Sequence, residues 1–198
     1  MDPDPVPAAP PHPLPGPHPA VGPEAQAEAE GADDGTHYPY RVAGGGAELT
    51  LLWWRGDGDR TESFAVDGAG RLLAFRDRAA LREHCGRAGL SLVDEEDSVL
   101  DLRPVGRWVR RGGTPPDQSL LEAWNAFEDL ARSLPDGPPL PAQGPLHDSA
   151  YVKLFGGSAL EPDAGDESWT PEETAAARGF LAAGLRLWEA GAREAVLR

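Results

Sequence analysis

The clearest pattern of apolar and polar positions lies between Leu120 and Leu134. Apolar residues recur there at offsets 0, 4, 7, 11 and 14, the spacing that keeps one face of a helix turned inward. They are Leu120, Trp124, Phe127, Ala131 and Leu134. Most of the charged residues of this segment fall away from that line. The pattern therefore predicts an amphipathic helix with a buried face. It indicates that these residues pack in the core, and it suggests no catalytic role for them.

A period of two, typical of strands, marks the N-terminal part of the chain. It predicts a strand over Ala47–Arg55, where Leu52 and Trp54 make the second face apolar as well. Gly- and Asp-rich turns separate this strand from two further predicted strands, over residues 60–66 and 71–75. These segments indicate an antiparallel β-meander. We interpret Gly44-Gly45-Gly46, just before it, as a flexible connector.

Helix signals follow the meander. Asp77 is expected to cap a helix over residues 78–88, and Gly89 to close it in the left-handed conformation. A short strand over residues 90–93 comes next, so the segment 76–89 is predicted to be a crossover between parallel strands. Beyond this point the pattern is helical, with a helix expected from Pro104.

The last two predicted helices differ in the strength of their signals. Residues 147–155 indicate a short helix, whereas Thr170-Pro171-Glu172-Glu173 combines a capping-box threonine with proline at the first helical position. Gly184 lies within the apolar stripe of that final helix. Glycine costs about 1 kcal/mol of helix propensity relative to alanine, so we expect Gly184 to allow the close approach of another helix, with that of Trp124 as the candidate.

Together these elements predict an α+β fold. An N-terminal antiparallel β-meander with one crossover helix is followed by a C-terminal helical half packed on the sheet. Residues 37–198 are expected to form a single α+β domain. Residues 1–36 contain ten prolines and an Ala/Glu/Gly/Asp-rich stretch, a composition typical of a disordered tail.

The formal net charge of −15 narrows the possible partners. The first 37 residues hold seven acidic side chains and no Lys or Arg, which leaves −8 for residues 38–198. An acidic chain is poorly suited to nucleic acid or to anionic membrane surfaces, and it favours solubility or a basic protein partner. No apolar run approaches a membrane span, and no secretory signal is visible, so a cytoplasmic protein is expected.

The sequence offers few candidates for catalytic or metal-binding residues. Cys85 is the only cysteine, and its neighbour His84 points about 100° away on the predicted helix, so the two cannot act as a nucleophile–base pair. The histidines show no metal-ligand spacing with Cys85, and the acidic run Asp94–Asp97 lacks the pattern of a calcium loop. The sequence therefore predicts no catalytic residue, no cofactor and no metal site, and an enzyme is the less favoured interpretation.

A ligand or partner groove is the remaining possibility. Its candidate residues are Trp53, Trp54, Tyr151 and Lys153. Lys153 is the only lysine; it is either a buried amine that contacts an anion or acts as a nucleophile, or a surface residue opposite Leu154, and we favour the surface interpretation. Such a groove would lie between the meander and the C-terminal helices.

Three segments carry a family resemblance. They are Leu121-Glu122-Ala123-Trp124-Asn125-Ala126-Phe127-Glu128-Asp129-Leu130, Tyr151-Val152-Lys153-Leu154-Phe155-Gly156-Gly157 and Trp169-Thr170-Pro171-Glu172-Glu173. In combination they resemble a family of uncharacterised small acidic actinobacterial proteins, over residues 47–190. The resemblance implies a compact domain, and it implies no activity and no catalytic residue.

Three functional hypotheses follow from these observations. The first is a non-enzymatic acidic protein-interaction module, immunity-like or regulatory, that binds a basic partner. The alternative is a small-molecule binding protein or enzyme with a pocket between the sheet and the C-terminal helices. The third is a structural or assembly subunit, and the sequence does not define an oligomeric state.

Overall fold

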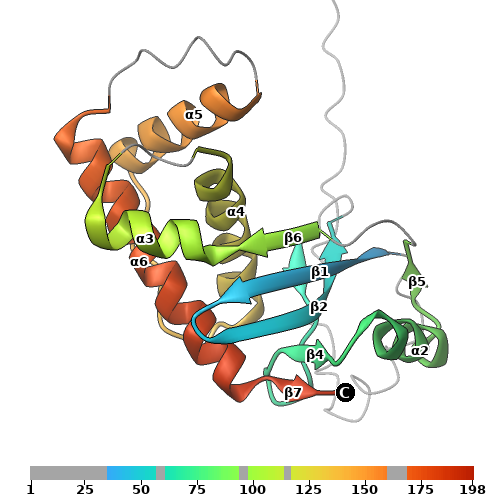
Figure 1. The fold of residues 1–198 in the computed structure, drawn as a ribbon. Coiled ribbons are helices and arrows are strands. Elements are labelled where there is room, and N and C mark those ends of the chain that lie inside the picture. Colours follow the sequence, from blue (N-terminus) through green and yellow to red (C-terminus); the bar gives the residue numbers. More distant parts are fainter. Residues whose placement is uncertain (1–34, 57–60, 94–97, 114–116, 160–168) are drawn as a thin grey trace, which may run out of the picture. The chain divides into compact units, whose positions relative to one another are not determined.

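The computed structural model of the chain describes residues 35–56, 61–93, 98–113, 117–159 and 169–198. The tail predicted over residues 1–36 lies outside them apart from Gly35 and Thr36, and so does the acidic run 94–97. The described residues form seven strands and five helices. As predicted, the strands come first and the larger helices follow, in an α+β fold (Figure 1).

Strands β1 (Thr36–Gly44) and β2 (Ala47–Arg55) form the centre of the sheet. They pair antiparallel along their whole length, and the two glycines between them have φ angles of 63° and 84°, as a type I′ hairpin turn requires. A Cβ atom on Gly44 would lie 2.6 Å from Cβ of Leu102, and one on Gly45 would lie 2.9 Å from Cγ of Glu189. The interpretation of this glycine run as a flexible connector is therefore wrong: it is a tight turn packed against two helices.

The sheet is mixed, in the order β5-β1-β2-β4-β7. Its further strands are short: β3 (Ser63–Phe64), β4 (Leu73–Phe75), β5 (Ser91–Leu92), β6 (Ser98–Asp101) and β7 (Val196–Leu197). Strands β3 and β4 pair antiparallel with β2, as the predicted antiparallel N-terminal sheet requires, but β4 pairs with β2 itself and β3 is shorter than the predicted 60–66. Strands β1, β6 and β7 were not predicted; β6 and β7 pair parallel with β1 and β4.

Helix α2 (Arg78–Ala88) is the predicted crossover. The Asp77 side chain accepts a hydrogen bond from the amide of Ala80, and Gly89 has φ 70°, so both predicted caps are present. The helix connects β4 to β5, and these strands run in the same direction with β2 and β1 between them. A small core joins α2 to one face of the sheet and includes Leu52, Leu73, Phe75, Leu81 and Cys85.

The larger core lies on the opposite face of the sheet, under the helical half (Figure 1). Its helices are α3 (Leu102–Arg111), α4 (Asp117–Ser133), α5 (Pro145–Ala159) and α6 (Pro171–Glu194). Leu51 of β2 points into this core, whereas the next residue, Leu52, points toward α2. The expectation that β2 is covered on both faces is therefore confirmed.

Helices α4 and α6 pack closely, as the sequence predicts. Trp124 of α4 stacks on Phe180 of α6, with ring centroids 4.1 Å apart. A Cβ atom on Gly184 would lie 2.0 Å from Cδ2 of Phe127, so only glycine allows this approach. Helix α6 begins with the predicted capping box of Thr170 and Glu173, and α5 is longer than the predicted 147–155.

Candidate functional site

The four residues of the predicted groove lie on two elements. Trp53 and Trp54 are neighbours on β2, and Tyr151 and Lys153 lie on α5. The Trp53 indole donates a hydrogen bond to Asp129 at 2.9 Å, with Tyr38 and Tyr40 beside its ring. Successive strand residues point to opposite faces, so the two tryptophans do not share a surface.

The α5 residues have other partners. The Tyr151 ring packs edge-on against Trp124 at 5.9 Å, and its hydroxyl donates to Asn125 at 3.0 Å. Lys153 donates to Glu173 of α6. The structure thus gives Trp53, Tyr151 and Lys153 three separate sets of partners.

Lys153 and Glu173 form a largely buried ion pair between α5 and α6. The Lys153 Nζ atom lies 2.7 Å from Oε2 of Glu173, and the two side chains are 16% and 7% exposed. Ser149 donates to the other carboxylate oxygen, and the amide of Thr170 also donates to Glu173. The hydrogen bond from Lys153, followed by those from Ser149 and Thr170, lowers the pKa of Glu173 to about 2. The surface interpretation of Lys153 is therefore wrong.

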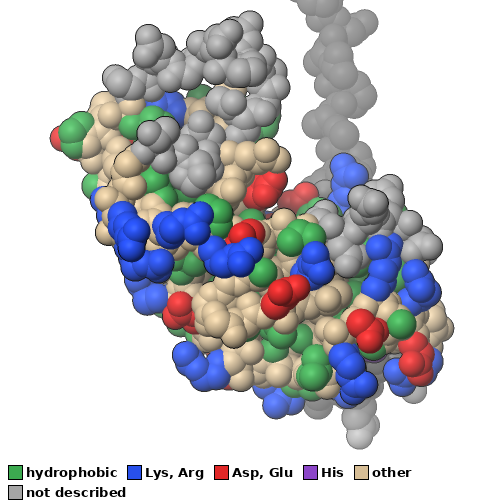
Figure 2. Space-filling model, viewed as in Figure 1, with side chains coloured by type: hydrophobic (Ala, Val, Ile, Leu, Met, Phe, Trp, Pro, Cys, Tyr) green, Lys and Arg blue, Asp and Glu red, His purple; other side chains and the backbone are tan. Residues whose placement is uncertain are grey.

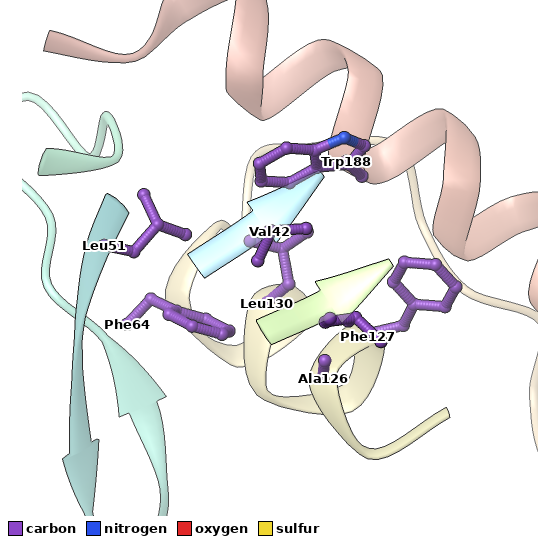
Figure 3. A pocket seen from close by; sticks show the side chains of 8 residues that line it. Val42, Leu51, Phe64, Ala126, Phe127, Leu130 and Trp188 are labelled. Atoms are coloured by element: carbon purple, nitrogen blue, oxygen red, sulfur yellow. The ribbon is translucent and has the colours of Figure 1, made fainter. Parts of the chain in front are cut away.

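The space between the sheet and the C-terminal helices is filled by apolar side chains (Figure 3). The hollow left there has a volume of about 10 Å³, enough for at most one water molecule. Its lining includes Leu51 and Phe64 from the sheet, and Phe127 and Trp188 from the helices. The residues that the structure describes at this place therefore leave no room for a metabolite.

A larger hollow, of about 350 Å³, lies between α3 and α6. Such a volume falls at the lower end of the range for ligand sites. Three arginines, two leucines, two glycines and one glutamate line it: Arg103, Arg107, Arg110, Leu102, Leu185, Gly45, Gly106 and Glu189. We call this hollow the α3 groove.

The amphipathic sequence of α3 places its arginines on the outside. Leu102, Val105 and Trp108 are buried against the core. At about 100° per residue, Arg107, Arg110 and Arg111 lie about 40°, 20° and 80° around the helix from Arg103, so the four share one face. We call these four residues, Arg103, Arg107, Arg110 and Arg111, the arginine stripe. Figure 2 shows basic side chains gathered over this helix.

Both ends of α3 are held in place. At the N-terminus, the Asp101 side chain accepts hydrogen bonds from the amide of Arg103 and from its guanidinium. At the C-terminus, Arg178 of α6 donates to the carbonyl of Val109, and the Trp108 indole donates to the carbonyl of Gly113. The stripe is therefore carried by a fixed helix, as a preformed binding surface requires.

The α3 groove has more positively than negatively charged side chains in its lining. Asp101 pairs with Arg103 at 2.8 Å, and this hydrogen-bonded pair lowers the pKa of Asp101. Among the side chains that the structure describes, no carboxylate forms an ion pair with Arg107, Arg110 or Arg111. The only acidic residue in the described lining is Glu189. The groove therefore offers guanidinium groups to an anion.

The α3 groove is a local basic site on a chain whose net charge is −15. Three of its eight described lining residues are arginines and one is a glutamate. The sequence argument from net charge missed this site, because net charge does not show where charges of one sign gather. A basic partner stays a prediction.

The signal for this site was present in the sequence. Arginines at positions 103, 107, 110 and 111 follow the i, i+4, i+7, i+8 spacing of a helix face. The prediction of this helix rested on Pro104 and on its apolar residues, and it did not consider the arginines. The second wall of the groove could not be anticipated, because Leu185 and Glu189 lie about 80 residues further along the chain.

Comparison of the chain with protein-family models, with curated proteins and with solved structures finds no match. Within the described ranges, no His, Cys, Asp and Glu side chains are grouped so that they could hold a metal ion. None of the helices described here is both long and apolar enough to cross a membrane. The function of the α3 groove therefore has to be inferred from its own geometry.

Proposed function

We propose that the protein is a binding protein that recognises an anionic partner through the α3 groove. The observation that carries this proposal is the pair Arg107 and Arg110. They line a hollow of about 350 Å³, and neither forms an ion pair with a carboxylate among the described side chains. Arginine forms bidentate hydrogen bonds with carboxylates and phosphates, so anions are the ligands that such a site fits.

The composition of the lining supports binding over catalysis. Its side chains are those of arginine, leucine and one glutamate, with glycine at two positions. Arginine stays protonated and cannot act as a general base, and the described residues of the lining include no serine, cysteine, lysine or histidine nucleophile. The site is suited to hold an anion and orient it.

Titration with a fluorescent oligoglutamate peptide, at low and at moderate salt, tests the proposal. The variant Arg107→Ala/Arg110→Ala should weaken binding about tenfold, because each exposed charge pair contributes up to about 1 kcal/mol. The matched control is Arg55→Ala/Arg76→Ala, which removes two exposed arginines outside the groove. An equal loss in both variants would mean that binding is a diffuse charge effect, and no loss in the first would overturn the proposal.

A further inference from the structure

The arginine stripe has the dimensions of an extended peptide. At about 1.5 Å per residue, Arg103 and Arg111 lie about 12 Å apart along α3, and arginines four positions apart lie about 6 Å apart. In an extended chain, alternate residues are about 6.6 Å apart and point to the same side. Acidic residues at every second position of such a chain therefore match the spacing of the stripe.

The two walls of the α3 groove differ in charge. This difference also indicates that acidic and uncharged residues alternate along a bound chain. The α3 wall carries the arginines, whereas the α6 wall presents Leu185 and Glu189. A carboxylate that faced Glu189 would be repelled. A bound chain would thus place its acidic side chains toward α3 and uncharged side chains toward α6.

Gly106 lies beneath one arginine of the groove. A Cβ atom there would lie 3.3 Å from Nη1 and 3.9 Å from Cζ of Arg110, and Gly106 is buried. The Arg110 guanidinium therefore lies over the bare backbone of Gly106. A side chain at position 106 would displace this guanidinium, so glycine allows Arg110 to lie close to the helix.

We propose that the groove binds an extended acidic segment of a partner protein, with acidic residues at alternate positions. Its carboxylates reach Arg107 and the neighbouring arginines of the stripe, and its uncharged side chains face Leu185. This inference rests on the proposed function. A nucleic acid strand has a similar charge spacing, and its binding is one of the outcomes of the test.

Three labelled probes and one unlabelled competitor test the inference by fluorescence anisotropy on the full chain. The probes are an alternating Glu-Ser octapeptide, a peptide with the same four Glu and four Ser in two blocks, and a single-stranded DNA octamer. The competitor is inorganic phosphate. We expect the alternating peptide to bind about five- to tenfold more tightly than the block peptide, because only its carboxylates all face α3. Equal affinity for the two peptides, preferential binding of DNA, or complete displacement by phosphate at about 1 mM would overturn the inference.

The variant Gly106→Leu keeps every charge and displaces the Arg110 guanidinium from its place over the helix backbone. It should weaken binding of the alternating peptide about tenfold and leave that of the block peptide unchanged, because diffuse attraction depends on the number of charges and not on their exact positions. Gly106→Ala, which adds one methyl group and favours the helix, should give a smaller loss in the same direction. Circular dichroism and a thermal melt establish that both variants are folded; if Gly106→Leu is not, Gly106→Ala decides.

The outcomes separate the two proposals. If Arg107→Ala/Arg110→Ala loses binding while both Gly106 variants bind like the wild type, the groove does not bind an extended chain, but the proposed function stands. If Arg107→Ala/Arg110→Ala binds every probe like the wild type, the proposed function fails as well.

Discussion

Gly184→Ala tests the packing of the helical half most directly. A Cβ atom at position 184 would lie 2.0 Å from Cδ2 and 2.3 Å from Cγ of Phe127, whereas carbon atoms in contact are normally about 3.5–4.0 Å apart. The Phe127 ring or one of the helices would have to move by about 1.5 Å to restore an ordinary contact. Phe127 is 2% exposed, and the hollow that it lines has a volume of only about 10 Å³, too small for its ring to turn into.

Two opposing effects determine how much Gly184→Ala changes the free energy of unfolding. Alanine favours the helix over glycine by about 1 kcal/mol. Overpacking a close-packed core costs about 1–3 kcal/mol, and the very short distance to Phe127 indicates the upper end of that range. We therefore expect Gly184→Ala to lower the free energy of unfolding by about 2 kcal/mol.

Gly179→Ala in the same helix is the matched control. Gly179 is exposed and a Cβ atom there would meet no neighbouring group within 4 Å, so the substitution should stabilise the protein by up to about 1 kcal/mol. Urea unfolding at 25 °C should thus give changes of opposite sign. The cost of Gly184→Ala should also shrink in a Phe127→Leu background. A Gly184→Ala variant as stable as Gly179→Ala would refute the assignment of this contact.

Two further predictions concern the same core. Trp124 is fully buried and stacks on Phe180, so Trp124→Ala should cost about 3–5 kcal/mol by urea unfolding, and a cost below about 1 kcal/mol would contradict the burial. Folding lowers the pKa of Glu173 from 4.5 to about 2, so its ionised form stabilises the fold above pH 4.5, and this contribution is lost as the pH falls toward 2. Between pH 5 and pH 2.5 the wild type should therefore lose more stability than Glu173→Gln; equal losses would show that the Lys153–Glu173 pair does not depend on the charge of Glu173.

Several elements could be predicted because their signals are local. Helix α2 has the predicted bounds, since Asp77 and Gly89 act on backbone groups within a few residues of themselves. The same holds for the Thr170 capping box and for β2, whose alternation indicates a strand before any partner is known. The close approach at Gly184 could also be predicted, because a glycine in an apolar stripe weakens its own helix and leaves room for a neighbouring one.

Other features were missed because they depend on distant residues. Strand β7 has two residues, too few for any alternation to be visible, and it exists because Val196 meets Leu73 of β4. Lys153 looked exposed from its own helix, and only the position of α6 brings Glu173 to it.

The α3 groove shows most clearly which features follow from the sequence and which depend on the tertiary structure. The sequence by itself determined that residues 103–111 place four arginines on one face of a helix, because the helical period is a property of the local backbone. The tertiary structure decided that this face forms one wall of a hollow, since Leu185 and Glu189 reach it only through the packing of α6. Periodicity and capping act over a few residues, whereas a groove forms only when distant surfaces pack.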